Sequence, residues 1–188
     1  MTKSVENVQP IRTLEQHVEF IEAIRKMSPK TADRNVLLYN LGISTGLRIG
    51  DLVKLRIEDV KGKSSLRIQE GKTKKPRTVY LDNIMADIAD YLENMASEGY
   101  LFPSAKGGYI TTTQAYRALQ KAADYLEWDW IGTHTLRKTY GYQYYKAYNN
   151  IVDLCEIFNH SSQAVTRRYI GLREEELGVT QRNFKPFG

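Results

Sequence analysis

Cysteine and histidine are scarce in this chain of 188 residues. It contains one cysteine, Cys155, and three histidines, His17, His134 and His160. A single cysteine excludes an internal disulfide and fits a reducing cytoplasm. Zinc sites are built mostly from thiolate and imidazole ligands, so this composition also argues against one. We therefore expect neither a disulfide nor a metal to hold the fold together.

Long hydrophobic runs are also missing. The N-terminal segment MTKSVENVQP lacks the apolar stretch of a secretory signal, and no run approaches the length needed to span a membrane. With 41% hydrophobic and 26% charged residues, the chain can build one domain with a real core, but it is too short for two full domains. We expect a soluble cytoplasmic protein in which residues 1–188 form a single domain.

The positive charge is modest overall and locally concentrated. A formal net charge of +5 permits a polyanionic partner without requiring one. Each basic cluster, taken alone, is equally explained by a solvated surface. The clusters are the segment GKTKKPR, with Lys72, Lys74, Lys75 and Arg77, and the pair Arg167 and Arg168 beside Tyr169.

The spacing of apolar residues predicts a mainly helical α+β domain with one small sheet. Strands are expected at 64–70 and 77–82, joined by the turn GKTKKP, with a first strand near 56–60. The first helices are expected at 14–27, at 32–44 with an end before a left-handed Gly46, and at 49–55. The later helices are expected at 84–95, 111–126, 134–147, 151–158 and 162–169.

Two segments in the first half of the chain carry candidate polar residues. Arg48 lies where one predicted helix ends and another begins, and Asp51 lies on the same helical face and could hold its guanidinium group. A surface ion pair of small consequence explains the same pattern. Lys72, in the predicted turn, could reach a phosphate or donate a proton, although a basic turn also protects a sheet edge from aggregation.

Two further segments lie in the second half. His134 and Arg137 would project from one face of a helix, and two cationic groups repel unless an anion lies between them. A histidine at the helix start beside a solvated arginine is the alternative. His160 precedes Tyr169 by nine residues. Tyrosine is a poor nucleophile unless cations stabilise its phenolate, and most of the 13 tyrosines are expected to pack rather than react.

Taken in order, the segments TGLRIGD, GKTKKPR, HTLR and NHSSQAVTRRY resemble the active-site series of the tyrosine recombinase (phage integrase) family. The resemblance extends over residues 10–172 and includes the spacing, since His160 follows Arg137 by 23 residues. It implies a mainly helical catalytic-domain fold with a small three-stranded antiparallel sheet. It also implies a site-specific recombinase or integrase of a mobile element that needs no cofactor or metal.

The resemblance also implies a role for each matching residue. Arg48 and Arg137 would hold the non-bridging oxygens of the scissile phosphate, and His160 would donate a hydrogen bond to it. Tyr169 would attack the phosphorus to form a 3′-phosphotyrosyl link, with His134 assisting the proton transfer. Among the remaining positions, Lys72 would protonate the departing 5′ oxygen, Asp51 would be a supporting residue, and Lys74, Lys75, Arg77 and Arg168 would contact DNA.

The chain departs from the family pattern in several places. Phe158-Asn159 stands where Leu-Gly is common, and Gly171 stands where a histidine often follows the nucleophile. Lys74 or Lys75 could replace Lys72 if the turn has a different register. No N-terminal core-binding domain is expected, so we predict weak, salt-sensitive binding to double-stranded DNA.

The partners and the competing functions follow from the same resemblance. It implies a homotetramer on two duplexes, with C-terminal segments exchanged, and leaves room for an accessory DNA-binding protein. A type IB topoisomerase-like activity and a non-enzymatic DNA-binding regulator are the alternative functions.

Overall fold

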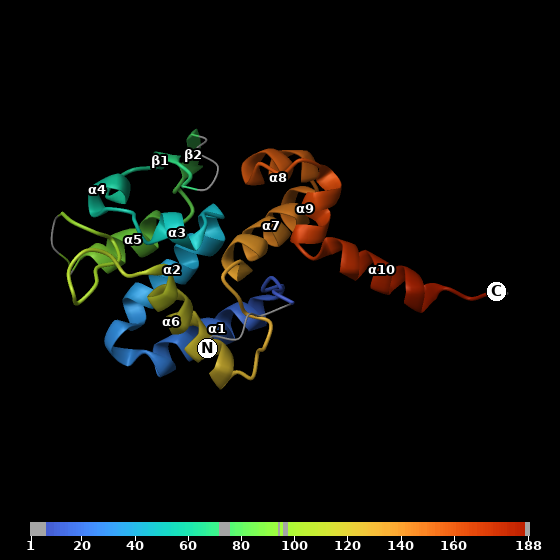
Figure 1. Ribbon diagram of the computed structural model, residues 1–188, viewed down its shortest axis with the longest axis horizontal. Helices are drawn as coiled ribbons and strands as arrows, with labels where there is room; N and C mark the ends of the chain where they lie inside the picture. The colour runs from blue at the N-terminus through green and yellow to red at the C-terminus, as the bar shows by residue number, and fades with distance from the viewer. Residues whose placement is uncertain (1–6, 72–75, 94, 96–97, 187–188) are drawn as a thin grey trace.

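The computed structural model describes residues 7–71, 76–93, 95 and 98–186, and in this part the protein is mainly helical (Figure 1). The described residues form ten α-helices, one 3-10 helix and a two-stranded antiparallel sheet. No helix among them is long and apolar enough to cross a membrane. The elements are α1 (Leu14–Met27), η1 (Pro29–Thr31), α2 (Ala32–Thr45), α3 (Ile49–Leu52), α4 (Ile57–Val60), β1 (Ser65–Gln69), β2 (Pro76–Tyr80), α5 (Met85–Leu92), α6 (Thr112–Tyr125), α7 (Thr135–Tyr148), α8 (Ile151–Phe158), α9 (Gln163–Tyr169) and α10 (Leu172–Asn183).

The helix boundaries follow local signals in the sequence. Reciprocal capping boxes open α1, through Thr13 and Gln16, and α6, through Thr111 and Gln114. Helix α2 ends at Gly46, which has φ +63° and the left-handed conformation that glycine adopts without steric cost. These predictions are confirmed. The short helix expected at 49–55 is shorter still, because α3 ends at Leu52.

The strand predicted near 56–60 is wrong. Residues Ile57–Val60 form helix α4, whose start is stabilised by the Asp59 carboxylate accepting the Arg56 N–H at 2.8 Å. The extended backbone just before this helix pairs with a distant segment instead. The Ile57 N–H donates to the Gly99 carbonyl, and the Leu101 N–H donates to the Leu55 carbonyl, both at 2.8 Å. Among the described residues the sheet therefore has two strands rather than three.

Two clusters of buried side chains hold the domain together. The larger one lies among α1, α2, α5 and α6 and includes Phe20, Tyr39 and Leu119. The smaller one lies beneath α7, α8 and α9 and includes Phe158 and Ile170. Helix α7 packs against α2 and joins the two clusters, while α10 projects away from the body toward the C-terminus (Figure 1).

The close packing around α7 depends on a glycine. An added Cβ at Gly141 would lie 2.6 Å from Ile170 Cγ2 and 2.7 Å from Phe158 Cε2. Glycine therefore allows α7 to approach both the end of α8 and the residue that follows α9. This approach brings the motifs of the second half of the chain next to each other.

Candidate active site

Arg137 is buried at the centre of the candidate site. It lies in the first turn of α7, and its side chain is 4% exposed. Its Nη1 donates to the carbonyl of Gly46 at 2.6 Å, and its Nη2 donates to the carbonyl of Phe158 at 3.3 Å. These bonds link the C-terminal ends of α2 and α8 to one guanidinium group, which fixes its orientation.

Arg48 meets Arg137 at a shared carboxylate. Arg48 is the extended residue that precedes α3, and its Nη1 donates to Oε2 of Glu70. Arg137 Nη1 lies 3.3 Å from the other oxygen, Oε1. Glu70 follows β1 and is only 3% exposed. The fold thus brings two arginines from distant motifs to the two oxygens of one buried acid.

Glu70 was missed by the sequence analysis, although a signal was present. Leu66, Ile68 and Glu70 alternate along the chain, so a strand places all three on one face. This face points into the protein, since the side chains of Leu66 and Glu70 are both buried. An acid in this register needs cationic partners, which the arginine motifs supply.

The arrangement around Asp51 differs from the one expected. Asp51 Oδ1 accepts the backbone N–H of Gly71 at 3.0 Å, so this acid supports the start of the turn after β1. In the described part of the chain, Glu70 rather than Asp51 accepts the hydrogen bond of Arg48. The expectation that Asp51 holds this guanidinium group is therefore corrected: Asp51 Oδ1 is bound to the backbone of Gly71, and Arg48 donates to Glu70 instead.

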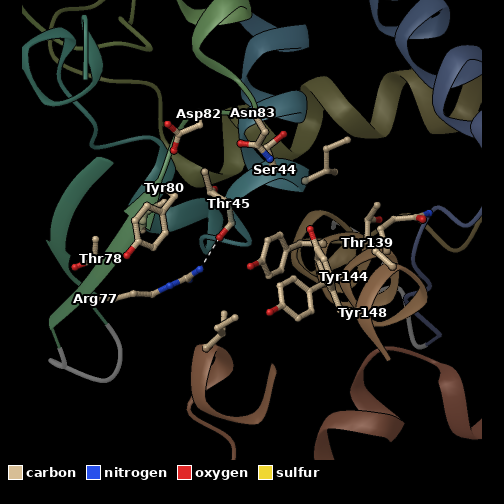
Figure 2. Close-up of a pocket in the computed structure, with 16 residues that line it drawn as sticks. Ser44, Thr45, Arg77, Thr78, Tyr80, Asp82, Asn83, Thr139, Tyr144 and Tyr148 are labelled. Atoms are coloured by element: carbon tan, nitrogen blue, oxygen red, sulfur yellow. Dashed lines mark hydrogen bonds between the residues drawn. The ribbon is translucent and has the colours of Figure 1, made fainter. Parts of the chain in front are cut away.

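Arg77 also turns inward. Its Nη2 donates to the carbonyl of Thr45 at 2.7 Å, a bond that is drawn in Figure 2, and its Nη1 lies 3.6 Å from Glu70 Oε1. The side chain is 15% exposed and borders a pocket between β2 and α7 that is lined in part by Tyr80, Tyr144 and Tyr148 (Figure 2). These contacts favour internal ion pairing over the DNA contact that we expected of Arg77.

Tyr169 ends α9 and lies between two histidines. Its hydroxyl oxygen is 3.1 Å from Nδ1 of His134, at the N-terminus of α7. The ring of His160 lies edge-on to it, with centroids 5.0 Å apart, and the ring of Phe158 lies 5.5 Å away. His160 is itself fixed by a 3.0 Å hydrogen bond between its Nδ1 and Thr166 Oγ1.

The electrostatics of the site are set by burial and by the two arginines. Burial raises the pKa of Tyr169 above its ordinary value, and the nearby charges of Arg137 and Arg48 oppose this rise. Burial lowers the pKa of His160, and the same two arginines lower it further. In the absence of DNA the site therefore favours a protonated phenol and a neutral imidazole at neutral pH.

The fold brings five of the predicted site residues together, namely Arg48, His134, Arg137, His160 and Tyr169. Arg168 is exposed, as a DNA contact would be, while its neighbour Arg167 pairs with Glu176. Lys72, Lys74 and Lys75 lie outside the described residues. Within residues 7–71, 76–93, 95 and 98–186, no group of three or more His, Cys, Asp or Glu side chains could hold a metal ion.

Comparisons with known proteins show which family this chain belongs to. The model of the phage integrase family matches residues 12–176. The probable integrase/recombinase YoeC of Bacillus subtilis (strain 168) is 39% identical over 183 residues, which cover 96% of this chain and 97% of that protein. The tyrosine recombinase XerH of Helicobacter pylori is 26% identical over 94% of this chain, which spans 52% of the relative's length.

Solved structures show the same fold. The XerH recombinase bound to palindromic difH substrate, in a post-cleavage complex, has a TM-score of 0.68 and 22% identity, covering 93% of this chain and 53% of that chain. The XerA recombinase has a TM-score of 0.67 and 24% identity, covering 94% of this chain and 65% of that chain. With the family model matching most of its length, the chain belongs to the phage integrase family and has the fold of a tyrosine recombinase catalytic domain.

Proposed function

We propose that this protein is a DNA strand transferase that performs site-specific recombination through a 3′-phosphotyrosyl intermediate. The observation that carries the proposal is the placement of the Tyr169 hydroxyl 3.1 Å from His134 Nδ1, with Arg137 and Arg48 near enough for their charges to oppose the rise in the phenol pKa that burial causes. A nucleophile, a proton acceptor and two permanent cations are the groups that phosphoryl transfer to tyrosine requires.

The reaction begins with attack by the Tyr169 oxygen on the phosphorus. Arg48 and Arg137 bind the non-bridging oxygens and stabilise the charge that develops there, which suits the planar donor geometry of guanidinium groups. His160 donates a hydrogen bond to the same phosphate, and His134 accepts the phenol proton. The new tyrosyl O–P bond replaces the bond from phosphorus to the 5′ oxygen.

The departing 5′ oxygen needs a proton, because an alkoxide is a poor leaving group. Lys72 is the donor implied by the resemblance, with Lys74 and Lys75 as the alternatives. A 5′ hydroxyl from another strand then attacks the phosphotyrosine and reverses the steps, releasing Tyr169. Bond energy is retained in the phosphotyrosine, so this scheme needs no nucleotide cofactor.

The proposed partners are double-stranded DNA and further copies of this chain. Helix α10 projects from the body of the protein (Figure 1). It carries the exposed apolar side chains of Leu177 and Val179, and Phe184, just beyond its end, is also exposed. These exposed side chains support an exchange of C-terminal segments between copies, and we propose that the assembly on DNA is a homotetramer. We further propose that the protein acts in the cytoplasm. We also propose that an accessory DNA-binding protein increases its affinity for DNA.

A covalent-trapping assay tests the chemistry. The protein is incubated with a library of nicked duplexes, and adducts that resist denaturant are collected and sequenced. The wild type should form an adduct, and Tyr169→Phe should form none while still binding DNA. Tyr148→Phe is the matched control, because Tyr148 is an exposed tyrosine on α7 and should leave the adduct yield unchanged.

Three outcomes would contradict the proposal or its choice of nucleophile. Failure of the wild type to form any adduct would indicate a DNA-binding regulator. A protein that relaxes supercoiled plasmid, but exchanges no strands between two copies of the DNA site recovered in the trapping assay, would be a topoisomerase. Adduct formed by Tyr169→Phe would show that the nucleophile is another residue.

A further inference from the structure

The carboxylate of Glu70 lies between the two arginines assigned to the scissile phosphate. Its Oε2 accepts a hydrogen bond from Arg48, and its Oε1 accepts one from Arg137 at 3.3 Å. Arg77 adds a third cation, with Nη1 3.6 Å from Oε1. Each oxygen of the acid is therefore directed at a different member of the proposed phosphate clamp.

Three guanidinium groups near one another need an internal anion before DNA is present. Burial lowers the pKa of Arg137, and the charges of Arg48 and Arg77 lower it further, while Glu70 opposes the change. This balance shows that the arginines repel one another and that the carboxylate offsets the repulsion. Without Glu70, separation of Arg48 from Arg137 would relieve this repulsion.

The acid reaches the cluster from the protein interior. Glu70 is 3% exposed, and the next residue, Gly71, is tied to Asp51 through its backbone N–H. The side chain of Arg48 is 21% exposed, and among the described residues its one hydrogen bond goes to Glu70. Because a guanidinium group has five N–H donors, Arg48 keeps donors for a phosphate at the surface.

We propose that Glu70 is a positioning residue that holds Arg48 and Arg137 side by side, ready for the scissile phosphate. This inference rests on the proposed function, which assigns both arginines to the scissile phosphate. Arg48, Arg77, Arg137 and Glu70 together carry two net positive charges, so the cluster attracts a phosphate even with the internal acid in place.

The test compares three variants with the wild type in single-turnover cleavage of a nicked duplex at saturating DNA. Glu70→Gln keeps the shape of the side chain and removes its charge. Its cleavage rate constant should fall by roughly 10- to 100-fold, because small misplacements of reacting groups have effects of this size. Its DNA affinity should stay equal or rise, because an acid has been removed from a site that binds an anion.

Two variants serve as controls. Glu58→Gln makes the same change in net charge at an exposed acid that pairs with Arg56, and it should keep the wild-type rate constant. Glu70→Asp keeps the charge on a shorter side chain, and its rate constant should lie between those of Glu70→Gln and the wild type. If Glu70→Gln does not fold, Glu70→Asp carries the test, with a rate constant below that of the wild type.

The rate constant and the amplitude separate the possible roles. A merely structural acid would lower the amplitude, which reports the folded fraction, and leave the rate constant unchanged, which would overturn the proposal. A faster Glu70→Gln would also overturn it, by showing that the acid competes with the phosphate. An inactive wild type would overturn the proposed function, whereas an active wild type matched by Glu70→Gln would overturn only the role of Glu70.

A second measurement needs no DNA. Guanidinium N–H signals observed by NMR report whether an arginine side chain is restrained. Arg48 and Arg137 should give restrained signals in the wild type, and Arg48 should lose its signal in Glu70→Gln, whereas Glu58→Gln should leave the Arg48 and Arg137 signals unchanged and alter only that of its own partner, Arg56. An Arg48 signal that is equally restrained in Glu70→Gln would overturn the positioning role.

Discussion

Nδ1 of His134 lies 3.1 Å from the hydroxyl oxygen of Tyr169, although the two residues are 35 positions apart in the chain. The contact joins the N-terminus of α7 to the C-terminus of α9. Burial raises the pKa of this tyrosine, so its phenol carries a proton at neutral pH when DNA is absent. The attacking oxygen must therefore lose that proton during the reaction, and His134 is placed to accept it.

The first prediction concerns this proton transfer. His134→Gln retains a hydrogen-bonding side chain that cannot accept the proton as a base. Cleavage at neutral pH should slow by roughly 10²- to 10⁴-fold, which is the usual contribution of general base catalysis. Raising the pH should recover part of the rate, because the phenol then ionises without help. A rate for His134→Gln that equals the wild type across pH would exclude His134 as the base.

The second prediction separates the two arginines. Arg48→Ala and Arg137→Ala should each reduce cleavage by roughly 10²- to 10³-fold, as the loss of one electrostatic stabiliser does. Their free energies of unfolding should differ. Arg137 is 4% exposed and holds two backbone carbonyls, so its loss should cost about 3–5 kcal/mol. Arg48 is 21% exposed, and its loss should cost about 1–3 kcal/mol.

Urea denaturation checks this difference, and the cleavage assay is run where both variants are folded. Equal losses of stability would show that the buried bonds of Arg137 contribute no more than the single bond of Arg48. Arg25→Ala is a suitable control, because Arg25 forms an exposed ion pair with Asp33, with a side chain 54% exposed. Such a pair contributes little to stability.

Local signals explain which parts of the fold could be predicted from the sequence. Apolar spacing and capping residues predicted α1 and α6 because these features act within a few residues of the helix ends. The strand predicted at 56–60 was wrong because only the backbone at its start is extended. That backbone pairs with residues 99–101, and local spacing in the sequence does not reveal so distant a partner. Helix α10 was not predicted, because its polar sequence has no clear apolar stripe.

The candidate site divides in the same way. The order and spacing of the motifs in the sequence are enough to predict that Arg48, Arg137 and Tyr169 act together. The role of Glu70 depends on how β1 lies against the ends of α2 and α7, and Asp51 is paired with Gly71 for the same reason. Contacts of this kind are set by tertiary packing, so a residue's own sequence neighbourhood does not specify them.

The third prediction concerns stability against pH. The pKa of His160 is lowered from its ordinary value of 6.5, chiefly by burial and then by Arg137 and Arg48. The unfolded chain therefore binds more protons than the folded one below pH 6.5, so stability falls as the pH drops through the folded pKa. His160→Asn should weaken this dependence, measured by urea midpoints between about pH 5 and pH 7.5.

His17 sets the baseline for that measurement. Its pKa is also lowered, mainly by burial, and its Nδ1 lies 2.9 Å from the hydroxyl of Tyr39, which is not one of the candidate site residues. Part of the acid sensitivity should therefore remain in His160→Asn. Two identical pH profiles, for the wild type and for His160→Asn, would contradict the role assigned to the half-buried imidazole of His160.

The fourth prediction concerns DNA affinity. The family model matches residues 12–176, and a catalytic domain by itself contacts few phosphates, so the binding of this 188-residue chain should be weak and should fall steeply between about 50 and 200 mM salt. Fluorescence anisotropy with a short duplex measures this slope. Arg168→Ala should weaken binding and reduce the slope, because this exposed side chain releases one counterion when it meets a phosphate. Nanomolar binding by the monomer at physiological salt would contradict the prediction.

The fifth prediction tests the close approach that places Tyr169. At Gly141 an added Cβ would lie 2.7 Å from Phe158 Cε2 and 2.6 Å from Ile170 Cγ2, so Gly141→Ala forces α7 away from these residues. The free energy of unfolding should fall by about 1–3 kcal/mol, as overpacking does. Gly50→Ala is the control, because its Cβ would meet only Thr112 Cγ2, at 3.7 Å. Cleavage should slow in Gly141→Ala alone, since Ile170 directly follows the proposed nucleophile; an unchanged rate would show that this packing does not position Tyr169.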